Sequence, residues 1–229
     1  MLHGHTTSQV LYLISVWAIP AVLAITLHEA AHGFVAWKLG DDTAYLRGRV
    51  TFNPLRHIDP FGTIVLPVLL LFTGGFLFGW AKPVPVNFAR LHHPRRDMVW
   101  VAAAGPATNL LLALISGYLI HVAVLFPETV SAWAVANLRN SILINVVLAV
   151  FNMLPLPPLD GGRVAVGLLP RPLALPLARL ERWGLFIIIG LLFILPMLSP
   201  SLNFLPWLLG RPIEFFIRLI EALTGVQLQ

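Results

Sequence analysis

Residues 22–38 have the sequence VLAITLHEAAHGFVAWK and contain the motif His28-Glu29-Ala30-Ala31-His32. No Asp, Glu, Lys or Arg precedes Glu29. The apolar segment 9–37 around it is long enough to cross a bilayer. An ionisable residue inside such a segment is costly and by default marks a functional site. We therefore interpret 9–37 as a membrane helix that carries a reactive centre.

The composition of the whole chain supports a membrane protein. Of its 229 residues, 58% are hydrophobic and only 11% are charged, whereas soluble domains carry about 25% charged residues. The length fits a single domain, 1–229, with a core at 9–165 and C-terminal helices at 183–223. The net charge of +5 arises from basic residues in short loops. That placement favours lipid headgroups over nucleic acid as the partner.

Apolar stretches predict an all-α polytopic membrane protein. We expect about four to six transmembrane helices, since each span needs about 20 apolar residues. The predicted spans are 9–37, 98–126, 140–155 and 183–199, and 127–139 is expected to be a loop. The tail 211–223 fits an amphipathic helix at the membrane surface. A last short span from about Phe204 is the alternative.

Segment 60–81 is ambiguous. It is long enough to cross the membrane, but Pro67 and Gly74-Gly75 interrupt it. The loops on both sides are basic, and the positive-inside rule places both in the cytoplasm, which one crossing cannot do. We therefore expect a possible re-entrant segment whose backbone is covered by protein. A simple span is the alternative.

Short strands are predicted outside the spans. Residues 44–53 fit a small membrane-associated β-hairpin around Arg47-Gly48, because glycine suits a tight turn. Residues 84–88 fit another strand. We expect His57, in the loop that follows the hairpin, to face lipid headgroups; an approach to the reactive centre is the alternative.

The predicted topology brings two distant parts of the chain to one depth. With 60–81 re-entrant, segment 9–37 runs inward and carries its motif toward the cytoplasmic half of the membrane. Segment 140–155 also runs inward and leads to Asp160. We expect both to meet on the cytoplasmic side.

The spacing of the first motif suits a metal ion. Residues four apart in a helix lie about 40° apart around its axis, so His28 and His32 point the same way and can bind one Zn²⁺. Glu29 lies beside that position and can take a proton from a water molecule that the metal activates. Two histidines packed against neighbouring helices are the alternative.

A third ligand is required, because catalytic zinc sites use three protein ligands. The chain contains no cysteine, so His, Asp or Glu must supply it. Asp160 is the only acidic residue between Glu128 and Glu181. It follows the proline-rich stretch 154–158, and such a helix break at membrane depth is tolerated where it lines a site. An aspartate that caps a helix is the alternative.

Three motifs together resemble a known family. They are His28-Glu29-x-x-His32, Ala104-Gly105-Pro106-x-x-Asn109 and Asn152-x-x-Pro155-x-Pro157-x-Leu159-Asp160-Gly161. In this order they resemble the site-2 protease family of intramembrane zinc metalloproteases. The stretch 48–60 is similar to the compact branch of that family, whose members lack PDZ and CBS domains.

The resemblance implies a role for each matched residue. His28, His32 and Asp160 would bind one catalytic zinc ion, and Glu29 would be the general base. Asn152 would lie near the scissile carbonyl, where an amide donor would stabilise the developing oxyanion, or it would orient the site. The resemblance also implies that Asn109 helps to hold the substrate; a polar contact between helices is the alternative.

The implied activity is hydrolysis of peptide bonds within or near transmembrane segments. The expected partners are a transmembrane protein or peptide substrate and the lipid bilayer, with no nucleic acid. The expected location is the bacterial cell (inner) membrane, with the active site facing the cytoplasm. A metal or proton transporter and a catalytically idle membrane-binding relative are the alternatives.

Overall fold

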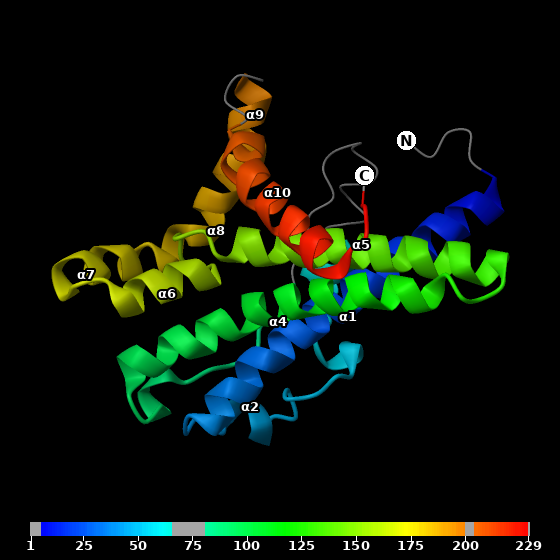
Figure 1. Cartoon of the computed structure of the whole chain (residues 1–229). Helices are drawn as coiled ribbons and strands as arrows, with labels where there is room; N and C mark the ends of the chain where they lie inside the picture. The colour runs from blue at the N-terminus through cyan, green and yellow to red at the C-terminus, as the bar shows by residue number, and fades with distance from the viewer. Residues whose placement is uncertain (1–5, 66–80, 200–203, 229) are drawn as a thin grey trace.

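The computed structural model describes residues 6–65, 81–199 and 204–228 (Figure 1). Of the described residues, 77% are helical. The described residues contain no β-strand. The predicted all-α class is therefore confirmed.

Three long helices form the centre of the molecule: α1 (Thr7–Lys38), α4 (Pro94–Ala123) and α5 (Glu128–Asn152). Within the described ranges, these three are the helices long and apolar enough to cross a membrane. Their most apolar windows have mean hydropathies of 2.3, 1.8 and 1.6. The three helices pack against one another in every pairing (Figure 1). The predicted total of four to six spans is not confirmed.

The α5 helix is longer than the sequence suggested. The expected loop at 127–139 is wrong, because the helix already begins at Glu128 and the connection from α4 is only 124–127. Pro127 precedes the first helical turn, and Glu128 in that turn interacts favourably with the helix dipole. These local start signals outweigh the polar composition of the segment.

The C-terminal half consists of shorter helices. They are α6 (Asp160–Leu168), α7 (Arg171–Arg179), α8 (Glu181–Ile189), α9 (Leu195–Leu198) and α10 (Leu205–Thr224). The predicted span 183–199 is interrupted by a π-helical turn at Gly190–Ile194. Pro196 accounts for the interruption, because it lacks an N–H and its ring displaces the carbonyl one turn earlier. The predicted tail helix 211–223 lies within α10.

The α10 helix anchors the C-terminus to the central helices. It crosses α4 and α5 and closes an apolar core that includes Ile142, Val146 and Ile220 (Figure 1). Gly117 permits the close approach, since a Cβ there would lie 2.7 Å from the Thr224 methyl group. Elsewhere the long helices expose large apolar side chains, as expected of surfaces that face lipid. Examples are Leu11, Ile14, Leu23, Trp100, Leu111 and Tyr118.

The predicted hairpin at 44–53 is wrong. Its first residues form the short helix α2 (Thr43–Leu46), and Gly48, with φ of 62°, makes the turn that follows. The Asp41 carboxylate accepts a hydrogen bond from the Thr43 backbone at 3.0 Å and so favours a helical turn. The Tyr45 ring stacks on Trp37 of α1, with ring centroids 4.5 Å apart.

Residues 82–87 form an extended strap without regular secondary structure, so the strand predicted at 84–88 is also wrong. Pro83 and Pro85 force the residue before each of them into an extended conformation and remove two N–H donors that a ladder would need. The strap is fixed at its far end, where Asn87 N donates to Asp41 Oδ2 at 2.6 Å.

The near end of the strap rests on the loop that contains His57. Lys82 N donates to His57 O at 2.9 Å. The His57 side chain is only 2% exposed, and its Nε2 donates to Thr51 O at 3.0 Å. The expectation that His57 faces headgroups is therefore wrong.

The segment predicted to be re-entrant, 60–81, falls mostly outside the described residues. Its start, Pro60–Val65, is a π-helical turn. The choice between a re-entrant segment and a simple span stays a prediction.

Candidate metal centre

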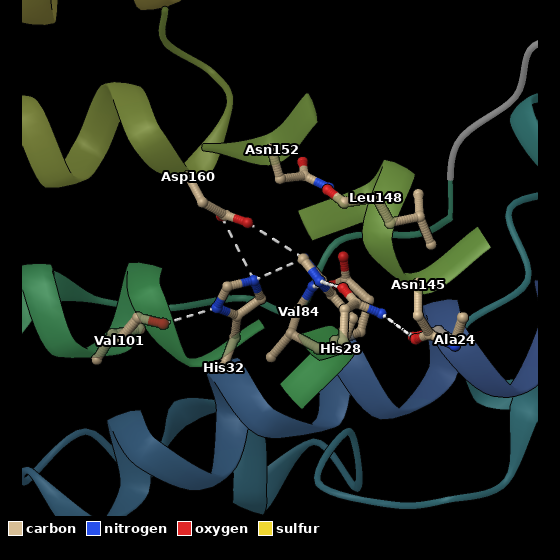
Figure 2. A network of polar contacts seen from close by, with 11 residues as sticks. Ala24, His28, His32, Val84, Val101, Asn145, Leu148, Asn152 and Asp160 are labelled. Atoms are coloured by element: carbon tan, nitrogen blue, oxygen red, sulfur yellow. Dashed lines mark hydrogen bonds and ion pairs between the residues drawn. The ribbon is translucent and has the colours of Figure 1, made fainter. Parts of the chain in front are cut away.

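Three buried side chains from two helices converge on one point (Figure 2). His28 and His32 come from α1, one turn apart, and Asp160 is the first residue of α6. His28 Nε2 lies 3.1 Å from Asp160 Oδ2, and His32 Nε2 lies 3.4 Å from Asp160 Oδ1. The two Nε2 atoms are 3.0 Å apart. The structure thus brings together the three residues that the sequence analysis selected as metal ligands.

A proline-rich link places Asp160 between the helices. Helix α5 ends at Asn152, and the link 153–159 leads to Asp160, which begins α6. Gly161 and Gly162 let the link pack closely, since a Cβ at either position would lie 2.2 Å from backbone atoms of the link. The carboxylate is therefore held by a compact backbone unit.

The orientation of the His28 ring is set by two asparagines. His28 Nδ1 lies 2.6 Å from Asn109 Oδ1. Asn109 Nδ2 donates to Asn145 Oδ1 at 2.8 Å and to Ala24 O at 3.3 Å, which fixes Oδ1 as the atom that faces His28. His28 Nδ1 must therefore carry the proton and donate, and its Nε2 is left to accept.

The His32 ring is oriented in the same way by a backbone carbonyl. Its Nδ1 donates to Val101 O of α4 at 2.7 Å (Figure 2). Both histidines thus present an Nε2 lone pair to the Asp160 carboxylate.

This donor set requires a cation. Two imidazole lone pairs and one carboxylate repel one another unless a proton or a metal ion lies between them. Asp160 Oδ2 is buried without a hydrogen-bond partner in the described part of the chain. The ligand atoms of a tetrahedral zinc site are about 3.3 Å apart, close to the observed 3.0–3.4 Å. The residues present therefore fit a zinc ion.

Charge within the group stabilises the Asp160 carboxylate. Burial raises the pKa of this carboxyl. When a proton lies between the histidine Nε2 atoms and the carboxylate, hydrogen bonds and positive charge from His28 and His32 outweigh burial and hold the pKa of Asp160 well below its usual range. The carboxylate form is the one that binds metal.

Gly105 of α4 makes room for the imidazole rings. A Cβ at this position would lie 2.5 Å from His28 Cε1 and 2.5 Å from His32 Nε2. Only a residue without a side chain lets α4 pass this close to the histidines. The Gly105 and Asn109 positions of the second motif therefore both face the metal group.

Glu29 lies beside the group but outside it. Its Oε2 accepts a hydrogen bond from the Val84 N–H of the strap at 2.8 Å. The side chain is half-buried. A carboxylate in this position is available as a base next to the metal position.

Asn152 and Asn109 both form hydrogen bonds within the protein, and their proposed roles toward a substrate stay predictions. Asn152 is half-buried, and its Nδ2 donates to Leu148 O of its own helix at 3.0 Å (Figure 2). Asn109 is fully buried and bonded to His28. Asn145 was not predicted as a site residue, because nothing in its spacing connects it to the motifs.

Comparison with known proteins gives the family. Over 201 residues the chain is 41% identical to "Putative zinc metalloprotease YwhC" of Bacillus subtilis. The aligned region covers 84% of the chain and 88% of that relative. The chain belongs to the site-2 protease family. It is also 33% identical over 184 residues to "Putative zinc metalloprotease Rip2" of Mycolicibacterium smegmatis, with 80% of the chain and 66% of the relative covered. No family model and no solved structure matches.

Membership of the site-2 protease family agrees with the donor set. The protein is a zinc metalloprotease by its relatives, and it contains a group that can hold the metal. Its apolar helices make it a membrane protein. Its substrates are therefore proteins, and its surroundings include lipid.

Proposed function

We propose that this protein is an intramembrane zinc endopeptidase that cleaves peptide bonds within or near transmembrane segments of other proteins. The observation that carries the proposal is the convergence of His28, His32 and Asp160 beside Glu29. Two of these ligands and Glu29 lie on α1, which is long and apolar enough to cross a membrane. A substrate that reaches this centre therefore has to enter a largely apolar environment.

Each residue has a defined task in the proposed reaction. His28, His32 and Asp160 hold the zinc ion, which when bound polarises a carbonyl and makes water more acidic. Glu29 takes a proton from the attacking water and then gives it to the leaving amine. The Val84 N–H leaves Glu29 Oε1 available for this transfer, since it occupies only Oε2.

The asparagines support the reaction from two sides. Asn109 orients the His28 ring, as its buried hydrogen bond supports. Asn152 stabilises the developing oxyanion. For this role, the Asn152 amide has to release its hydrogen bond to the Leu148 carbonyl and donate to the substrate instead.

We place the protein in the bacterial cell membrane as one integral domain, 1–229, with the active site facing the cytoplasm. The positive-inside rule supports this orientation. Arg163 and Glu181 form an ion pair at 2.9 Å beside the proline link, on the α6 and α8 side of the site. Residues 163–182 contain four arginines and one acidic residue, and this excess of positive charge agrees with a cytoplasmic face.

The first prediction concerns Glu29. Purified Glu29→Gln protein should fold and bind one zinc ion but cleave a transmembrane peptide at least about 100-fold more slowly, because the general base is lost. Zinc content and fragment formation measure the two properties. Glu128→Gln, an exposed residue at the start of α5, is the matched control and should leave both unchanged.

Normal turnover by Glu29→Gln would overturn the proposed function. Zinc transport into proteoliposomes that persists in this variant would instead favour a transporter. A transport path needs ionisable residues along the whole membrane depth, whereas the described ionisable residues of the centre are gathered at one point.

A further inference from the structure

The strap reaches Glu29 through a single peptide group. The Pro83–Val84 peptide donates its N–H to Glu29 Oε2 at 2.8 Å. Its carbonyl, on the opposite edge, accepts from Arg49 Nη2 at 3.4 Å. A trans peptide is planar, so its N–H and C=O edges move together. Arg49 and Glu29 are therefore connected through one rigid unit.

Arg49 is held firmly at its own end. It is only 8% exposed. Its guanidinium also donates to Lys82 O at 2.6 Å and to Arg56 O. These bonds join the strap to the loop before it, and the planar fork of arginine allows several carbonyls to be bound at once.

Arg49 forms no salt bridge in the described part of the chain. Within the described ranges, no carboxylate lies within ion-pair distance of its guanidinium. Burial lowers the pKa of Arg49, and the charge of Glu29 partly offsets this effect. Because the peptide lies between them, the cation polarises its N–H toward the carboxylate.

We propose that Arg49 is a positioning residue that holds the Glu29 carboxylate in its reactive orientation through the Pro83–Val84 peptide. The two prolines of the strap serve this arrangement. Each fixes the preceding residue in an extended conformation, so that Val84 N–H faces Glu29 without help from a β-ladder. The inference rests on the proposed function, because it assigns Glu29 the role of base.

The test compares Arg49→Gln and Arg49→Lys with Arg47→Gln, an exposed arginine two residues away. Arg49→Gln should bind one zinc ion and keep its KM, but its kcat should fall on the order of 10- to 100-fold, because the base is misplaced. Arg49→Lys should be similarly impaired, since an ammonium lacks the fork. Arg47→Gln should match the wild type in all three measurements.

A second measurement does not depend on cleavage. The chain contains three Pro–Val peptides, 67–68, 83–84 and 85–86. Labelling with ¹³C-carbonyl proline and ¹⁵N-valine therefore isolates three amide signals, and loss of one signal in Val84→Ile assigns Val84. Glu29→Gln and Arg49→Gln should each shift the Val84 amide proton upfield, and Arg47→Gln should not.

Three results would overturn the inference: an unchanged Val84 amide in Arg49→Gln, full activity of Arg49→Lys, or loss of zinc from Arg49→Gln. The last would show a purely structural role, because Arg49 does not touch the metal ligands. If the wild type itself does not cleave, the proposed function fails. The Val84 signal then still shows whether the Arg49–peptide–Glu29 connection exists.

Discussion

At the scale of single residues, the centre depends on side chains that touch the histidines and do not themselves bind metal. Gly105 leaves space for both rings, and Asn109 fixes the proton of His28 on Nδ1. Such supporting contacts decide which lone pairs are presented to the metal, and their loss usually costs 10- to 100-fold in metal affinity, to order of magnitude.

Gly105→Ala should abolish zinc binding while most of the helical structure remains. The new Cβ would meet His28 and His32 at 2.5 Å, so the rings have to turn away from Asp160. Zinc content and circular dichroism of the purified protein measure the two effects. Gly210→Ala in α10, where a Cβ meets nothing within 4 Å, is the control; a zinc-replete Gly105→Ala protein would contradict the argument.

Asn109→Ala should weaken zinc binding by about 10- to 100-fold, and Asn145→Ala by less, because the latter removes only one of two acceptors of the Asn109 amide. Competition with a zinc chelator gives the affinities. Among the described residues, the side chain of Asn137, also on α5, bonds only Trp133 O of its own helix, so Asn137→Ala should bind zinc normally. Equal affinities for all three variants would exclude this role for the asparagines.

Much of the centre follows from the sequence at this scale. The spacing of His28 and His32 predicts a shared face, and Asp160 stands out as an isolated acid after prolines. Asn145 could not be found, since its contact with Asn109 spans 36 positions and carries no local signal. The Val84 N–H is likewise a backbone group with no side-chain identity to detect.

At the scale of elements, the length of the apolar stretches predicted α1 and α4 well, because a long apolar stretch in a bilayer has few stable alternatives to a membrane-spanning helix. Local chemistry decided the errors. Asp41 bonds the turn that becomes α2 in place of a strand, and Pro196 interrupts the expected span at 183–199. Capping and proline effects of this kind act over a few residues and outweigh the hydrophobic pattern from which the strand and the span were predicted.

The packing of α8 on the proline link should be essential for the metal centre. A Cβ at Gly184 would lie 2.0 Å from Pro157 O, so Gly184→Ala should displace the link that carries Asp160. We expect lower zinc affinity and a loss of about 1–3 kcal/mol in stability, as for other overpacked sites. Gly190→Ala, with open space around its Cβ, is the control for both measurements, and equal behaviour of the two variants would refute the coupling.

At the scale of the whole molecule, the metal joins parts of the chain that are far apart in sequence. The three side chains proposed as its ligands come from α1 and from α6, and α4 and α5 supply the groups that orient His28. Four helices thus share one centre. Zinc binding should therefore contribute to the stability of the fold as well as to chemistry.

Removal of zinc should lower the unfolding temperature of the detergent-solubilised protein. At zinc concentrations 1,000-fold above Kd, binding adds about 4 kcal/mol. Unfolding followed by tryptophan fluorescence, with and without a chelator, measures the difference. His32→Ala should unfold at one temperature under both conditions, and a chelator effect of full size in that variant would contradict the assignment.

One consequence follows from the equal spacing of two motifs. His28 and His32 are four residues apart on α1, and Gly105 and Asn109 are four residues apart on α4, so each helix offers one matching turn to the other. A shift of α4 by one residue, about 1.5 Å along its axis with a turn of about 100°, would put the side chain of Ala104 or Pro106 where Gly105 stands. The two motifs therefore permit only one alignment of α1 with α4. An insertion between His28 and His32, or between Gly105 and Asn109, would destabilise the centre more than a substitution on the lipid-facing side of either helix.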